Sequence, residues 1–172
     1  MSAGAIKDLR ESTGCGIMDC KRALDEAKGD MKKAKELLRE RGLQMALKKA
    51  DRTAKEGRVE AYIHNGSKIG VLLEVNCETD FVGRNDDFIQ FTKDVAMHIA
   101  AMAPKYIKKE DVPAEMIPAD EKPEDFVKAN CLLAQPFVKD SSKAVGDLLN
   151  ELVAKIGENI VVNRFTRYKI GE

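Results

Sequence analysis

The chain has 172 residues, 44% of them hydrophobic and 34% charged, with equal numbers of basic and acidic side chains and so no net charge. This composition is typical of one globular domain, or of a small module with a compact core, and excludes a chain that is disordered throughout. No apolar run is long enough to cross a membrane, and the first residues form neither a secretory signal nor a transit peptide. We therefore expect a cytoplasmic or already processed protein, although a copy encoded inside an organelle would need no transit peptide either.

Charge is distributed unevenly along the chain. Residues 1–55 hold 14 Lys and Arg against 9 Asp and Glu, whereas residues 56–172 hold 15 against 20. The basic first part could contact RNA or an acidic protein surface, although a solvated helix face explains the same charges. The second part carries no field that would attract nucleic acid.

The four cysteines lie in helical or strand patterns: Cys15, Cys20, Cys77 and Cys131. Their spacing is not that of metal ligands, and only two histidines accompany them. We expect free buried thiols rather than a disulfide or a zinc site, and we expect neither a metal nor another cofactor.

The first third of the chain predicts short helices. An apolar stripe that begins at Ile6 is interrupted over residues 13–16 and resumes over residues 17–27 at steps of three and four. Asp30 can cap the next helix, and Gly42 is predicted to close it. The residues that follow continue in helical register, so three short helices and a connector helix result.

The Gly14-Cys15-Gly16 turn does not fit a nucleotide-binding loop. No strand precedes it, and Asp19 occupies the place of the third glycine in a dinucleotide fingerprint. The chain also lacks a nucleophile elbow, a Walker motif and a metal cluster. We therefore expect a protein that is not an enzyme.

Beyond Gly57 the hydrophobic period changes from that of a helix to that of a strand. Residues 59–64 alternate, Asn65-Gly66 suits a tight hairpin turn, and residues 69–75 return as a second strand. An amphipathic helix then begins near Asn85 and ends before Pro104. We expect it to cover one side of the sheet, with Phe88 and Phe91 in the core.

The last part alternates between irregular and regular patterns. Five prolines punctuate residues 104–136, which predicts an exposed excursion with only short elements. Ser142 can cap a following helix that stops at Gly157, and a strand over residues 159–170 should join the hairpin. The order of elements predicts an α+β protein, with a helical module before a small antiparallel sheet covered by helices.

The connection between the second strand and the next helix contains an aromatic residue. Phe81 follows directly on the acidic residues Glu78 and Asp80. Because aromatic side chains on loops usually fold back onto their own core, spacing alone favours a buried Phe81 over one that projects into a partner. His64 adjoins the hairpin turn, from which it could reach a partner.

The chain resembles the elongation factor Ts family in three stretches: LRESTGCGIMDCKRAL at 9–24, LEVNCETDFV at 73–82 and VAKIGENI at 153–160. The resemblance implies a guanine-nucleotide exchange factor for the GTPase elongation factor Tu. It also implies that residues 1–55 form a module similar to a ubiquitin-associated domain, and that residues 56–172 form the core and dimerisation domain.

The resemblance implies roles for particular residues and reverses the preference for a buried Phe81. One set enters the GTPase domain and dislodges Mg²⁺ from bound GDP: Thr79, Asp80, Phe81 and Val82. Another set contacts the same partner from the helical module or the hairpin: Arg10, Ile17, Met18 and His64. Family members often carry Met at the position of Ile17, and a branched side chain adapts less readily to a partner surface than Met18 does.

The resemblance also bears on assembly. Long family members contain two copies of the hairpin and helix, whereas this chain has one. A homodimer would restore two copies, with His64 of one subunit and Phe81 of the other serving the same partner in a heterotetramer. Thr166 stands where some short members carry a cysteine, so a covalent dimer is not expected.

Two other functions fit part of the sequence. An RNA-associated translation or ribosome-assembly protein would use basic residues of the connector: Lys48, Lys49, Arg52 and Lys55. This alternative leaves Asp80 unexplained, since a carboxylate repels phosphate, and we expect no direct nucleic-acid binding. A purely structural binding module with an unrelated core is the other alternative, and deleting the helical module would then abolish partner binding.

Overall fold

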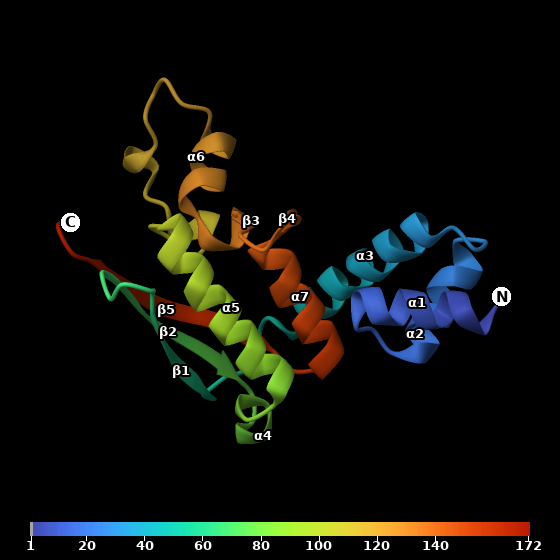
Figure 1. Cartoon of the computed structure of the whole chain (residues 1–172). Helices are drawn as coiled ribbons and strands as arrows, with labels where there is room; N and C mark the ends of the chain where they lie inside the picture. The colour runs from blue at the N-terminus through green and yellow to red at the C-terminus, as the bar shows by residue number, and fades with distance from the viewer. Residues whose placement is uncertain (1) are drawn as a thin grey trace. The chain divides into compact units, whose positions relative to one another are not determined.

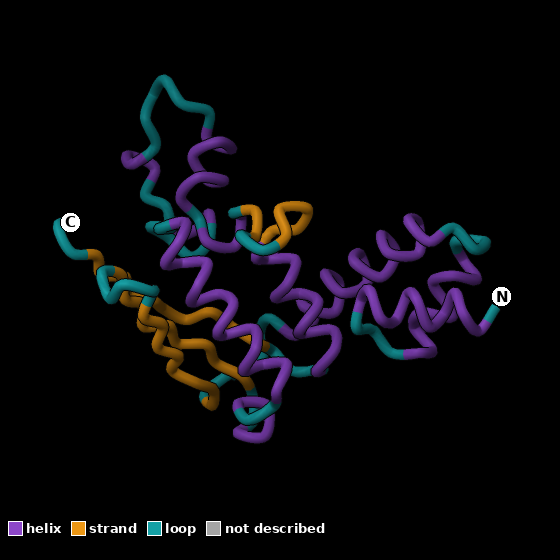
Figure 2. Tube along the Cα trace, viewed as in Figure 1, coloured by secondary structure: helices purple, strands orange, loops and turns teal. Residues whose placement is uncertain are grey.

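A computed structural model describes residues 2–172 of the chain, which divide into two compact units (Figures 1 and 2). Unit 1 consists of Met1–Arg52 and Asn150–Asn159, and unit 2 of Thr53–Leu149 and Ile160–Glu172. Helices precede a small antiparallel sheet with its own helices, which confirms the predicted α+β class.

Unit 1 is helical and contains α1 (Ala3–Thr13), α2 (Ile17–Glu26), α3 (Met31–Lys49) and the later part of α7 (Val145–Ile156). Gly14 ends α1 in the left-handed conformation, with φ of 68°. Asp30 caps α3 as predicted, because its carboxylate accepts hydrogen bonds from two backbone N–H groups of the first turn. The core of the unit consists of Leu9, Cys20, Ala23, Leu24, Ala27, Ala34 and Leu38.

The predicted helix end at Gly42 is wrong, since α3 continues through it to Lys49. Gly42 is buried in the helix, and a Cβ atom placed on it would lie 3.6 Å from Ala154 Cβ and from the Asn150 carbonyl oxygen. Gly42 therefore packs against α7 within a continuous helix, and the expected connector is the second half of α3.

Unit 2 is built around a three-stranded sheet. Its elements are β1 (Glu56–Ile63), β2 (Ile69–Cys77), α4 (Asp80–Gly83), α5 (Asp86–Met102), α6 (Pro123–Asn130), β3 (Pro136–Phe137), β4 (Asp140–Ala144) and β5 (Ile160–Lys169), with 3₁₀ turns at Lys109–Asp111, Ala114–Met116 and Leu132–Ala134. The strand order is β1-β2-β5 and both pairings are antiparallel, so the last strand joins the hairpin as predicted.

Helix α5 covers one face of this sheet (Figure 1). It begins after Asn85, whose side chain accepts hydrogen bonds from the N–H groups of Asp87 and Phe88. Phe88 and Phe91 are buried as predicted. On the covered face, β2 contributes the buried side chains of Val71, Leu73, Val75 and Cys77.

Strand β1 carries its exposed apolar side chains on the sheet face that α5 does not cover. Glu60 lies opposite Leu73 in the register and is buried, whereas Val59 and Ile63 are exposed. The Glu60 carboxylate is paired with Arg58 at 2.8 Å and accepts a hydrogen bond from the Thr92 hydroxyl. Pairing compensates for the burial of this charge on the covered face.

Residues 104–136 form the predicted excursion of short elements (Figure 2). Its two ends are held together, because the Asn130 carbonyl accepts from the N–H groups of Lys105 and Tyr106, and Leu132 N–H donates to the Tyr106 carbonyl. The predicted cap at Ser142 is wrong. Ser142 is bonded to Asp140 within β4, and α7 begins at Val145.

Candidate partner-binding site

The one-turn helix α4 carries Phe81 outward from unit 2. The Phe81 side chain is 83% exposed, whereas its neighbour Val82 is buried. Asn85, which follows the turn, donates its N–H to the Val82 carbonyl at 3.0 Å and caps α5 with its side chain. The alternative of a Phe81 folded onto its own core is therefore wrong, and the ring is available for a contact outside unit 2.

Asp80 precedes Phe81 on the same turn. Its carboxylate lies 3.2 Å from the Arg84 guanidinium, and both side chains are more than half exposed. Exposed ion pairs contribute little free energy, because water screens them. Asp80 can therefore exchange Arg84 for a group on a partner at small cost.

Arg10, Ile17 and Met18 come together in unit 1. They line one cavity of about 910 Å³, between the end of α1, the start of α2, and α3. The Ile17 and Met18 side chains are 55% and 63% exposed, because Gly16 starts α2 directly before them and they occupy its first turn. These apolar side chains are accessible beside the Arg10 cation.

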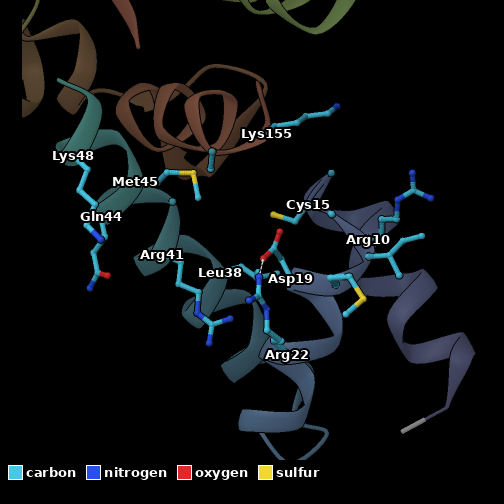
Figure 3. A pocket seen from close by; sticks show the side chains of 16 residues that line it. Arg10, Cys15, Asp19, Arg22, Leu38, Arg41, Gln44, Met45, Lys48 and Lys155 are labelled. Atoms are coloured by element: carbon cyan, nitrogen blue, oxygen red, sulfur yellow. Dashed lines mark hydrogen bonds and ion pairs between the residues drawn. The ribbon is translucent and has the colours of Figure 1, made fainter. Parts of the chain in front are cut away.

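The rim of this cavity is rich in cations (Figure 3). It includes the side chains of Arg10, Arg22, Arg41, Lys48 and Lys155, and Arg22 is paired with Asp19. Burial raises the pKa of the Cys15 thiol in the same wall, which favours the protonated thiol over the nucleophilic thiolate at neutral pH. The chemistry of the cavity is that of binding an apolar, acidic surface.

His64 lies at the turn between β1 and β2, and its Nδ1 atom is 3.0 Å from the Tyr62 hydroxyl oxygen. Phe81 follows the opposite end of this hairpin, where Glu56 pairs with Cys77. The length of the strands separates the two ends by about 25 Å at the usual rise per residue. A single unit 2 therefore does not bring His64 and Phe81 together.

The described residues contain no group of three or more acidic, His or Cys side chains placed to hold a metal ion. No helix among them has the length and apolar character needed to cross a bilayer.

Comparison with known proteins settles the family. The sequence model described as Elongation factor TS matches residues 19–124. Elongation factor Ts of Caldanaerobacter subterraneus subsp. tengcongensis is 53% identical over an alignment that covers 100% of this chain and 98% of that protein. The chain belongs to the elongation factor Ts family. It is thus a translation elongation factor, and the resemblance of its three stretches is confirmed.

Other relatives agree with the assignment. Elongation factor Ts of Carboxydothermus hydrogenoformans is 52% identical, with 97% of this chain and 88% of that protein covered. Elongation factor Ts of Moorella thermoacetica is 49% identical, with 100% and 96% covered. Most alignments extend over 195 positions, more than the 172 residues of this chain, so these family members contain residues that it lacks.

One surface of this elongation factor Ts chain was not among the sequence-based candidates. The sheet face opposite α5, which we call the open sheet face, carries the exposed side chains of Val59, Ile63, Leu72 and Tyr168. Thr166 lies beside Leu72 in the register. Hydrogen bonds from Asn163 and Arg164 lower the pKa of the Glu74 carboxyl on this face, which keeps it charged at neutral pH.

Proposed function

We propose that this chain acts in the cytoplasm as a guanine-nucleotide exchange factor, which binds elongation factor Tu carrying GDP and accelerates GDP release. It would catalyse no reaction of its own. Family membership supports the proposal, and one structural observation carries it. Phe81 projects from the turn α4, while the next residue of the same turn, Val82, is buried in the core. An exposed aromatic side chain on an anchored turn suits insertion into a pocket.

In this proposal Phe81 acts as a wedge in the GTPase domain, with Thr79, Asp80 and Val82 forming its support. Burying a Phe side chain contributes about 1.5–3 kcal/mol, which offsets part of the cost of distorting the partner. The distortion dislodges Mg²⁺, the largest countercharge of the bound phosphates. The GTPase then binds GDP more weakly. By linkage, GDP weakens the binding of this chain by the same factor, and GTP then refills the site.

Residues 1–55 would supply a second contact with the same partner through Arg10, Ile17 and Met18. These side chains offer two exposed apolar groups beside a cation. They would add affinity without touching the nucleotide site. Residues 56–172 would supply the wedge, His64 and the surface for dimerisation.

Release of fluorescent GDP from purified elongation factor Tu tests the exchange function. With excess unlabelled GDP present, the wild-type chain should accelerate release, and Phe81→Ala should lose most of the acceleration. Met116→Ala is a matched control, because Met116 is 51% exposed and belongs to the excursion. No acceleration by the wild-type chain would reject exchange and favour the RNA-associated alternative.

We also propose a homodimer, formed by the open sheet faces of two copies and able to bind two GTPases. The face is apolar at Val59, Ile63 and Leu72, and a two-fold axis would pair it with itself. Sedimentation velocity at micromolar concentration should show a dimer for the wild type and a monomer for Leu72→Lys. Met116→Lys should leave the dimer intact, and a monomeric wild type would refute the assembly.

A further inference from the structure

The wedge helix α4 is too short to be stable alone. It contains four residues, Asp80–Gly83. The hydrogen bonds inside a single helical turn do not offset the conformational entropy that is lost when the turn is ordered. Phe81 adds little packing within unit 2, since it is 83% exposed. The direction in which Phe81 points therefore depends on contacts between the ends of the turn and the sheet.

The first end is held by Cys77, the last residue of β2. Its backbone is paired with Glu56 on one side and Ile160 on the other, and its side chain is fully buried. The thiol donates a hydrogen bond to the Thr79 carbonyl oxygen, with 3.1 Å between sulfur and oxygen. The same carbonyl accepts the N–H of Gly83 at 3.4 Å, so the thiol fixes the acceptor around which the turn closes.

The second end lies against a glycine in β1. A Cβ atom on Gly83 would lie 3.1 Å from the carbonyl oxygen of Gly57, so the backbones of the turn and the strand are in close contact. Gly57 itself has a φ of 141° and no room for a side chain. The two ends hold the turn at fixed points, Val82 is buried, and Phe81 projects beside the exposed Asp80.

We propose that Cys77 is a positioning residue for nucleotide exchange, whose thiol preorganises the turn that carries Phe81. This inference rests on the proposed exchange function. A turn ordered before binding spares the complex the cost of ordering it. Without the thiol, the Thr79 carbonyl loses one of its donors and the turn samples other conformations, so fewer encounters present the ring correctly.

The test compares three variants in the GDP-release assay at concentrations well below saturation. Cys77→Ala should lower the second-order rate constant of release by about three- to tenfold, the usual range for one hydrogen bond. Cys77→Ser, which keeps a donor at this place, should recover most of the rate. Cys131→Ala is the matched control, because Cys131 is also a fully buried thiol in unit 2, and it should match the wild type.

A second measurement needs no partner. Amide hydrogen exchange by NMR should show the Gly83 N–H less protected in Cys77→Ala, by a factor similar to the loss of rate, and unchanged in Cys131→Ala. Equal rates and equal protection for Cys77→Ala and the wild type would overturn the role of Cys77 while leaving the exchange function standing. A wild-type chain that fails to accelerate release would overturn both.

Discussion

Gly57 is the residue at which the backbone leaves least freedom for substitution. Its φ of 141° lies where side-chain-bearing residues are strained, and a Cβ atom would lie 2.2 Å from the Val75 carbonyl oxygen in the paired strand. Val75 belongs to the buried face of β2 and cannot move aside without disturbing the core. Any side chain at position 57 is therefore incompatible with the observed register of β1 and β2.

Gly57→Ala should lower the free energy of unfolding by about 3 kcal/mol or more, from backbone strain and overpacking together. Urea denaturation followed by circular dichroism measures this change. Gly66→Ala separates the two causes, since Gly66 also has positive φ but nothing within 4 Å of the added atom. That control should cost only about 1–2 kcal/mol, and equal losses would show that the contact with Val75 is harmless.

Within helix α3, Gly42 leaves room for one more carbon atom. A Cβ atom there meets Ala154 and the Asn150 carbonyl at 3.6 Å, which is ordinary van der Waals contact. Gly42→Ala should therefore raise the free energy of unfolding by about 0.5–1 kcal/mol through helix propensity. Gly42→Leu should lower it, because the added atoms have no space. Urea denaturation compares them, and a destabilised alanine variant would contradict the spacing.

Helix α5 is joined to the β3–β4 hairpin through the buried His98. Its Nδ1 atom accepts the N–H of Val138, so the ring proton lies on Nε2 and is donated to the Gln135 side-chain oxygen at 2.9 Å. Burial lowers the pKa of His98 below its ordinary value of 6.5, against the smaller effect of the Gln135 hydrogen bond. A second ring proton would face the Val138 N–H and break this connection.

Acid should therefore weaken the chain through His98. Above about pH 6.5 the ring is neutral in both states and its stabilisation is complete. As the pH falls below that value, the unfolded chain takes up a proton that the folded chain resists, and this stabilisation is lost. The difference in unfolding free energy between wild type and His98→Asn should shrink on acidification. A difference that stays constant from about pH 8 to about pH 5 would contradict it.

Hydrophobic periodicity predicts most helices and strands of this chain. It does not predict the role of a residue that suits two different structural positions. Gly42 has the signature of a helix end, and only the proximity of Ala154, more than a hundred positions away, shows that it is a packing site. Ser142 has the signature of a cap, yet the adjacent Asp140 carboxylate binds it first. Local sequence does not reveal such competing partners.

The open sheet face could have been found from the sequence. A two-residue turn at Asn65-Gly66 places even-numbered residues of one strand on the same face as odd-numbered residues of the other. Glu60 then shares a face with Leu73, and Val59 lies on the opposite face, as the structure shows. In the structure Ile63 pairs with Gly70, so the turn is longer than two residues. It still pairs odd-numbered with even-numbered residues, and the assignment of faces is unaffected.

The projection of Phe81 illustrates the reverse case. Spacing alone favours burial, and nothing in residues 76–82 indicates that Val82, rather than the larger ring, fills the space under the turn. The resemblance to elongation factor Ts corrected this preference, and the three-dimensional contacts of Gly57 and Cys77 explain it.

The separation of His64 and Phe81 makes the assembled dimer testable by mixing. If each partner GTPase meets His64 of one subunit and Phe81 of the other, a dimer of one His64→Ala and one Phe81→Ala subunit retains one intact site. Random exchange of subunits should then restore about a quarter of the wild-type exchange activity from two weakly active variants. Activity of the mixture equal to the average of the two separate variants would show that both side chains act from one subunit.

Hydrogen bonds at the base of the excursion allow residues 107–130 to change in length without disturbing the sheet. Since the Asn130 carbonyl and the N–H groups of Lys105 and Tyr106 fix the distance between its ends, added chain enters and leaves at the same two points. The entropy of closing a loop grows only slowly with its length. A reporter domain inserted into this arm should therefore leave Phe81 and the open sheet face in place.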